Sequence, residues 1–242
     1  MLSFDRYLEY VRTNSVRLAE AAGNAGLDAA VPTCADWNVE QLVRHASRPL
    51  QWAAANVKAG GTMVQPADLE RAPKGPEALP WFRAAADDCV AVLEAAGPDA
   101  PAWGWADDHH AAFWARRMAH EMAVHRYDAE SAAGERRPID GELAVDGIDE
   151  FLSLMAFHPA GGAAVGAGET IHLHCTDREG EWLLRRDAER LQVTRAHAKG
   201  DVAARGTASD LLLMLESRLP VTAVACFGDA SLLERWQDEV SF

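Results

Sequence analysis

The first part of the chain shows helical periodicity. Apolar residues recur three and four positions apart, which places them on one face of a helix, and turn-forming segments separate the stretches. Four such stretches begin near Phe4, Val39, Leu79 and His110, and a fifth helical stretch runs from about Glu142 to Phe157. Long helices joined by loops are typical of a helical bundle.

Residues at the ends of these stretches indicate where the helices start and stop. Asp36 or Asn38 is expected to be the N-cap of the second helix, because short polar side chains accept hydrogen bonds from the first free backbone amides. Gly23 and Gly26 are expected to end the first helix, and Gly97 is expected to end the third. Pro49 is expected to kink or shorten the second helix.

The pattern changes after a segment rich in glycine and alanine, residues 158–168, which we interpret as a linker. Residues 171–175 and 181–185 resemble strands around a turn at 177–180, and a third strand is expected at 191–195. Short helices are expected at 208–216 and 231–239. The sequence therefore predicts an up-down four-helix bundle in domain 1-158 and a small α+β domain in 165-242.

Charge and composition narrow the function. The chain has 242 residues, with 37 acidic and 23 basic side chains and a formal net charge of -14, and it lacks the basic face that nucleic acid requires. No apolar stretch is long enough to cross a membrane, and the first residues do not resemble a signal peptide. We expect a cytoplasmic protein, a monomer or weak homodimer, that acts on a small molecule and binds neither nucleic acid nor membrane.

One helical segment carries candidate metal chemistry. Glu121 and His125 are four residues apart, so both project from one side of a helix, as two ligands to one ion require. A catalytic metal commonly takes three protein ligands, and His45 on the second predicted helix is the candidate third. The alternative is that these are hydrogen-bonded core residues, and spacing alone leaves both interpretations open.

Several other polar residues are weighed against structural roles. We expect the acidic residues of the segment 107–110 to stabilise a helix start rather than to bind metal. His172 and His174 share one strand face, but without a third partner in view we interpret them as strand-face residues. Cys34 is either a reactive thiol or a buried packing residue. Asp128 either holds His125 by a hydrogen bond or caps the apolar face of its helix. The four cysteines are expected to be reduced thiols, because they are far apart in a long chain.

Two motifs resemble a known family. Residues 31–45, VPTCADWNVEQLVRH, resemble the segment C-x-x-W-[T/N]-V-x-x-L-V-x-H of the mycothiol-dependent maleylpyruvate isomerases, within the DinB/YfiT-like helical bundles. Residues 117–128 are similar to the second motif of that family, and residues 208–236 resemble its sterol-carrier-like second domain. The run Ala46–Pro49 departs from the family pattern, which leaves the shape of the pocket and the substrate open.

The resemblance implies a set of site residues. It assigns His45, Glu121 and His125 as ligands of a divalent metal, normally zinc, and mycothiol as the thiol cosubstrate. It also implies that Arg218 holds an anionic substrate or the thiol. Trp37 and Trp52 flank His45 in the sequence and are candidate walls of the cofactor pocket, with a place in the core as the alternative.

Three functions are compatible with these residues. The first is a metal- and thiol-dependent enzyme, either a cis-trans isomerase or an S-transferase, acting on an anionic or electrophilic small molecule. The second is a bundle that holds metal or senses metal or thiol without turnover. The third is a carrier whose second domain binds an apolar ligand.

Overall fold

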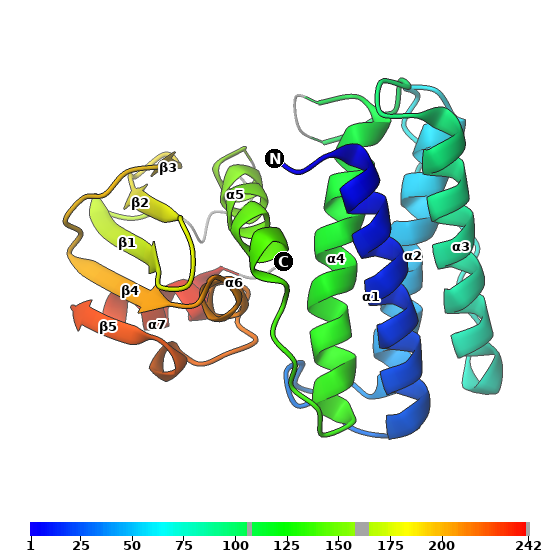
Figure 1. Ribbon diagram of the computed structural model, residues 1–242, viewed down its shortest axis with the longest axis horizontal. Helices are drawn as coiled ribbons and strands as arrows, with labels where there is room; N and C mark the ends of the chain where they lie inside the picture. Colours follow the sequence, from blue (N-terminus) through cyan, green and yellow to red (C-terminus); the bar gives the residue numbers. More distant parts are fainter. Residues whose placement is uncertain (106–107, 158–164, 241–242) are drawn as a thin grey trace. The chain divides into compact units, whose positions relative to one another are not determined.

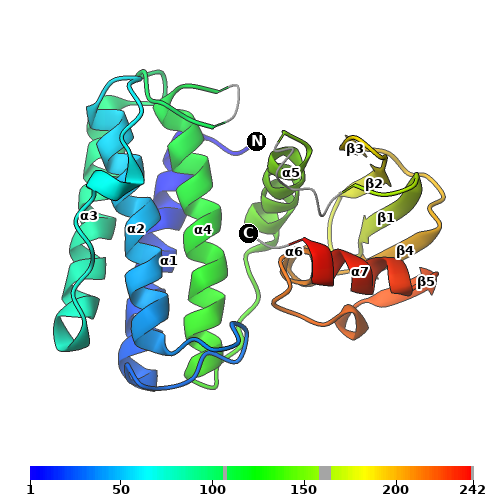
Figure 2. The ribbon, with the colours of Figure 1, turned by 180° about the vertical axis from the view of Figure 1, so that it is seen from behind.

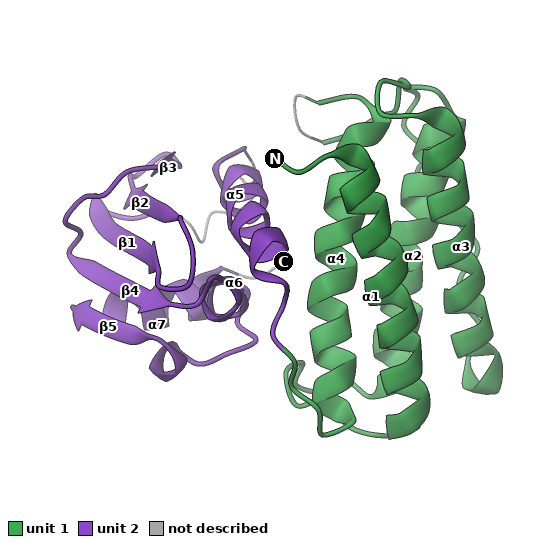
Figure 3. Cartoon of the chain, in the orientation of Figure 1, with its two compact units in different colours: residues 1–137 green, residues 138–242 purple. Residues whose placement is uncertain are grey.

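The computed structural model describes residues 1–105, 108–157 and 165–240, and the chain divides into two compact units, residues 1–137 and 138–242 (Figure 3). The first unit is a bundle of four long helices (Figure 1). These helices are α1 (Phe4–Ala25), α2 (Val39–Lys58), α3 (Ala78–Ala96) and α4 (Ala111–Ala132). The four-helix bundle expected from the hydrophobic periodicity is confirmed.

The ends of the helices follow the local sequence. Asn38, one of the two expected N-caps, accepts a hydrogen bond from the amide of Gln41, whose side chain in turn bonds the amide of Asn38. Gly97 has a positive φ of 76° after the last turn of α3. Pro49 does not end α2, which continues to Lys58, because the helix loses only the one backbone hydrogen bond that the missing N–H would make.

Helices α1 and α4 lie side by side and run in the same direction. The ring of Tyr7 contacts that of His120, and further along both helices Arg17 forms an ion pair with Glu130. Helix α2 runs in the opposite direction to α1. After α2 the chain returns to the start of that helix before α3 begins, as the hydrogen bond from the amide of Gly75 to the carboxylate of Glu40 shows. The connection between α2 and α3 therefore runs along the bundle (Figure 2). This arrangement is known from bundles with one long crossover and differs from the simple up-down order expected from the sequence.

A buried polar network joins α1 and α4. The guanidinium of Arg126 donates hydrogen bonds to Glu130 at 2.6 Å and to Asn14 at 3.2 Å. Glu130 also accepts a bond from Arg17 at 2.7 Å. Only 1% of Arg126 and 2% of Glu130 are exposed, so each charge depends on its partners for the hydrogen bonds that water would otherwise supply.

The second unit is α+β, as expected, with a five-stranded mixed sheet in the order β3-β2-β1-β4-β5. Strands β1 and β4 are parallel, and the other neighbours are antiparallel. The strands are β1 (Glu169–Cys175), β2 (Glu181–Arg186), β3 (Leu191–Thr194), β4 (Val202–Gly206) and β5 (Ala225–Gly228), and the helices are α5 (Gly141–Phe157), α6 (Ala208–Leu215) and α7 (Ser231–Glu239). Three strands were predicted; β4 and β5 are short and did not show a strand pattern.

The two faces of the sheet differ. Ile171 and Leu173 on β1 and Trp182 and Leu184 on β2 are fully buried, and they alternate with the residues of the other face. Helix α5 contacts β3, helix α6 contacts β1 and β4, and helix α7 contacts β1. The core of this unit therefore lies on one side of the sheet.

Helix α5 belongs to the second unit, since it contacts α6 and β3. The domain ranges expected from the sequence, 1-158 and 165-242, placed this helix with the bundle, whereas the units divide between Arg137 and Pro138. Residues 158–164 of the expected linker lie outside the described residues. Among the described residues, every helix is too short or too polar to cross a membrane.

Candidate metal centre in the helical bundle

Three side chains from two helices of the bundle meet at one point. Glu121 and His125 project from α4, and His45 projects from α2. The Nε2 atom of His125 lies 3.2 Å from Oε1 of Glu121, and Nε2 of His45 lies 4.0 Å from the same oxygen. One possible ligand atom from each side chain lies within 4.8 Å of the other two. This donor set, two imidazoles and one carboxylate, suits zinc.

The second oxygen of Glu121 is held from the side. Arg117, one helical turn earlier on α4, donates a hydrogen bond to Oε2 at 2.7 Å, while Oε1 faces the two histidines. Burial favours the neutral acid, but the hydrogen bond from His125 and the charge of Arg117 outweigh burial and lower the pKa of Glu121. Glu121 is therefore an anionic oxygen donor at neutral pH.

His125 is oriented by a buried carboxylate. Its Nδ1 lies 3.0 Å from Oδ2 of Asp128, which is 0% exposed, and Oδ1 of Asp128 accepts a hydrogen bond from Thr33 at 2.6 Å. Burial lowers the pKa of His125, but the hydrogen bonds with Asp128 and Glu121 outweigh it and raise that pKa to about 9. A proton on Nδ1 leaves Nε2 to coordinate a cation, the usual arrangement of a metal-binding histidine. Of the two roles considered for Asp128, the structure shows the hydrogen bond to His125.

The first sequence motif positions the partners of this cluster. The amide of Val31 donates to the carbonyl of Trp37 at 2.9 Å, and Asp36 between them takes a positive φ of 67°, a conformation that aspartate tolerates better than most residues. The tight turn brings the Trp37 ring to 4.7 Å from the His45 ring, measured between centroids. The His45 ring in turn lies 5.0 Å from that of His125.

The other two predicted site residues have the following surroundings. Trp52 stacks on Trp105, with 5.4 Å between ring centroids, and its indole donates to the carbonyl of Val64. Trp52 thus belongs to an aromatic cluster with Trp103, Trp105 and Trp114. Arg218 lies in the second unit after α6, where its Nη1 donates to the carbonyl of Glu216 at 2.8 Å.

A hollow of about 300 Å³ borders His45, and sequence reasoning did not assign it. Its charged lining consists of three arginines and one glutamate: Arg44, Arg48, Arg71 and Glu70. Excess positive charge beside the cluster suits a carboxylate or another anion. Arg48 is three residues after His45 on α2. Helical spacing in the sequence is therefore sufficient to predict that the two side chains are neighbours on one face of the helix.

The remaining polar residues considered in the sequence lie outside the cluster of His45, Glu121 and His125. Asp108 accepts a hydrogen bond from the amide of His110 and contacts its ring nitrogen at 2.8 Å, at the start of α4; Asp107 lies outside the described residues. Cys34 is partly exposed, and all four cysteines are free thiols. His172 and His174 lie on β1 beside Glu181 and His197, two partners that the sequence reasoning missed.

Fold and site together define a class of two-domain proteins in which a four-helix bundle with a His–Glu–His cluster precedes a small α+β domain. Residues 8–130 match the model of the mycothiol maleylpyruvate isomerase N-terminal domain, and residues 142–235 match that of the MDMPI C-terminal domain. The chain therefore belongs to the mycothiol-dependent maleylpyruvate isomerase family.

Solved structures share this fold. The crystal structure of the mycothiol-dependent maleylpyruvate isomerase superposes with a TM-score of 0.62 at 12% identity, and a histidine-to-alanine variant of the enzyme gives 0.63 at 10% identity. Each comparison covers 93% of both chains. The comparison with curated proteins found no match.

Proposed function

We propose that this protein is a metal- and thiol-dependent cis-trans isomerase that acts as maleylpyruvate isomerases do, with mycothiol as cosubstrate. The observation that carries the proposal is the convergence of His45, Glu121 and His125 within 4.8 Å, beside a cationic hollow. Family membership supports the reaction class, and the donor set supports a zinc ion.

The residues present fit such a metal. Glu121 supplies an ionised oxygen, and Asp128 holds His125 with Nε2 directed toward Glu121. A zinc ion at this position would lower the pKa of a thiol, so that the thiolate exists at neutral pH. Three protein ligands leave a fourth position for an exogenous group.

The reaction needs no net change in atoms or electrons. The thiolate adds to one carbon of a conjugated cis double bond, and the electron pair moves into the neighbouring carbonyl. Rotation about the resulting single bond follows, and expulsion of the thiolate restores the double bond in the trans form. The protein must hold the carboxylates of the substrate during this rotation.

Arginine is the residue suited to that task, because its planar guanidinium matches a carboxylate with two hydrogen bonds. Arg48 and Arg44 line the hollow that borders His45, which favours an anionic substrate there. Arg218, implied by the family resemblance, remains a second candidate. Arg48→Gln and Arg218→Gln distinguish the two candidates, because only substitution of the arginine that holds the substrate should raise KM.

The test is turnover by the zinc-loaded full chain with mycothiol and maleylpyruvate, followed by absorbance and mass spectrometry. We expect a trans product of unchanged mass, and loss of turnover in His45→Ala, whose side chain is 47% exposed and whose removal leaves the helix intact. His110→Ala, an exposed histidine paired with Asp108, is the matched control and should keep full activity.

Two results would contradict the isomerase. A stable product heavier by the mass of mycothiol would identify an S-transferase. Absence of both product and adduct, in protein that binds zinc with full occupancy, would identify a bundle that binds metal without turnover.

A further inference from the structure

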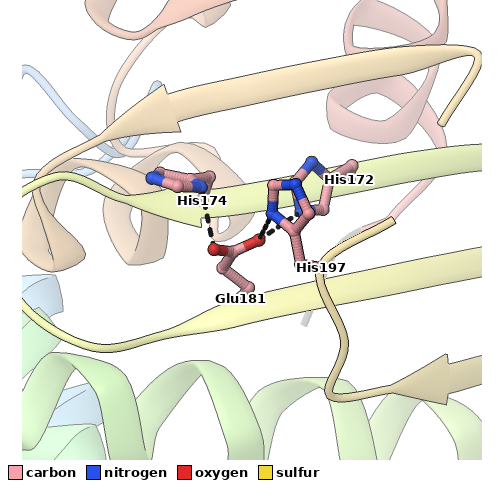
Figure 4. Close-up of side chains that lie close together, drawn as sticks. All are labelled: His172, His174, Glu181 and His197. Atoms are coloured by element: carbon pink, nitrogen blue, oxygen red, sulfur yellow. Dashed lines mark hydrogen bonds and ion pairs between the residues drawn. The ribbon is translucent and has the colours of Figure 1, made fainter. Parts of the chain in front are cut away.

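Four polar side chains converge on one face of the sheet in the second unit (Figure 4). They are His172, His174, Glu181 and His197. All four belong to residues 138–242 and thus to a different unit from the candidate centre in the bundle.

The strand register brings three of them together. His172 and His174 alternate with the buried Ile171 and Leu173 on β1, so both histidines share the other face of the sheet. Glu181 begins β2 directly opposite His174 in the antiparallel pair. His197 comes from the connection between β3 and β4 and reaches the same carboxylate (Figure 4).

Glu181 is the centre of the group. Its Oε2 lies 3.0 Å from Nε2 of His172 and 2.6 Å from Nδ1 of His197. Its Oε1 lies 3.1 Å from Nδ1 of His174. One possible ligand atom from each of the four side chains lies within 4.8 Å of all the others. Three ring nitrogens thus surround one carboxylate.

Charge and exposure also suit a cation. Burial raises the pKa of Glu181, but the hydrogen bonds from His197 and His172 outweigh burial and lower it, which favours the carboxylate. The side chain of His172 is 8% exposed, whereas that of His197 is 80% exposed. The cluster is therefore anchored in the sheet on one side and open to solvent on the other.

We propose that these four side chains form a second metal site, which binds a divalent transition metal of the zinc type. Imidazole and carboxylate are ligands that zinc accepts, and tetrahedral bonds of about 2.0 to 2.2 Å place neighbouring donor atoms about 3.3 to 3.6 Å apart. The contacts of Glu181 with the histidines, at 2.6 to 3.1 Å, are shorter than that spacing. The limit of 4.8 Å that holds for all pairs of donor atoms is longer. Side-chain rotations therefore suffice to meet it.

The number of donors indicates a structural role. Four protein ligands complete a tetrahedron and leave no position for substrate. Two of the ligands come from β1, one from β2, and His197 from the connection that follows β3. A bound ion would therefore fasten this connection to the sheet, independently of the reaction proposed for the bundle.

Zinc stoichiometry tests the site directly. The full chain, stripped with chelator and dialysed against zinc, is analysed by mass spectrometry of the metal, alongside His45→Ala and the double variant His174→Ala/His197→Ala. We expect the wild type to bind an ion at each site, and each variant to lose one equivalent. His110→Ala serves as the control, because His110 pairs with a carboxylate outside both clusters.

A local measurement identifies where the ion binds. Lys199 is exposed two residues after His197, so trypsin cleavage after Lys199 reports on the connection itself. Zinc should slow this cleavage at least several-fold in the wild type and in His45→Ala. It should leave the rate unchanged in the double variant, whose substitutions fall on partly or largely exposed side chains.

Two outcomes would overturn the second site. One is equal zinc content in the wild type and the double variant, with no effect of zinc on cleavage after Lys199. The other is complete loss of zinc in His45→Ala, which would place all bound metal in the bundle. Failure of the bundle centre alone gives the opposite pattern, in which the double variant binds no zinc and His45→Ala behaves as the wild type.

Discussion

Nδ1 of His125 lies 3.0 Å from the carboxylate of Asp128, three residues further along the same helix. Asp128 is fully buried and also accepts a hydrogen bond from Thr33, in the loop that precedes α2. One aspartate therefore connects the two sequence motifs of the bundle and fixes the ring of the central histidine.

Asp128→Asn should weaken zinc binding by about 10- to 100-fold, the usual effect of removing a carboxylate that orients a ligating histidine. The amide keeps the shape of the side chain but offers no charge to hold the proton on Nδ1. Competition with a chromophoric chelator measures the affinity. Asp88→Asn, on an exposed carboxylate paired with Lys58, should match the wild type. Equal affinities in both variants would show that Asp128 does not orient the ligand.

Zinc binding to the bundle should release a proton. The pKa of His125 is raised to about 9 in the metal-free chain, so the ring is charged at neutral pH, whereas the metal requires a free ring nitrogen. Apparent affinity should rise about tenfold per pH unit below that pKa and level off above it. Calorimetry in buffers of different ionisation enthalpy counts the protons. Binding with no proton release at neutral pH would contradict the protonated state of His125.

Arg48→Gln should raise KM for a dicarboxylate substrate while leaving kcat nearly unchanged. Arg48 lines the hollow beside His45 but is expected to bind the substrate equally in the ground and transition states, which affects KM alone. The loss of a charge-assisted pair is worth about 1.5 to 3 kcal/mol, or roughly ten- to a hundredfold in KM. Steady-state kinetics give both constants. The control is Arg83→Gln, because Arg83 lines a different hollow, between α1 and α3. An equal rise in KM in both variants would show that Arg48 does not bind the substrate.

Glu130→Gln should destabilise the bundle by about 3 kcal/mol, because it leaves Arg126 charged and buried without its carboxylate. Urea unfolding followed by tryptophan fluorescence provides the measurement. Glu94→Gln removes an exposed ion pair with Arg12 and should cost less than about 1 kcal/mol. If both substitutions cost the same, the buried network contributes no more than a surface pair.

The helices of the bundle could be predicted from the sequence because each repeats its apolar pattern over several turns. Strands β4 and β5 could not, since Val202–Gly206 and Ala225–Gly228 are short and contain few of the β-branched or aromatic residues that mark strands. The place of α5 in the second unit was also missed, because periodicity indicates that a helix is amphipathic but not which partner its apolar face contacts.

The candidate sites show the same division. Glu121 and His125 are brought together by helical spacing, which the sequence displays, but their distance from His45 depends on how α2 packs against α4. In the sheet, the turn at 177–180 sets His174 opposite Glu181. Alignment of the two predicted strands around this turn is sufficient to predict that pair. His197 could not be anticipated, because it lies in a connection without regular structure, and its approach to Glu181 depends on the tertiary fold.

The pairing of α1 with α4 affects how the chain folds during synthesis. Contacts such as that between Arg17 and Glu130 join residues 113 positions apart. Helix α1 packs mainly against the last helix of the bundle, so most of its contacts form only after a partner made more than 100 residues later has left the ribosome. Such long-range contacts slow folding and expose apolar surface meanwhile. We therefore expect chaperones to bind the nascent bundle until α4 has left the ribosome.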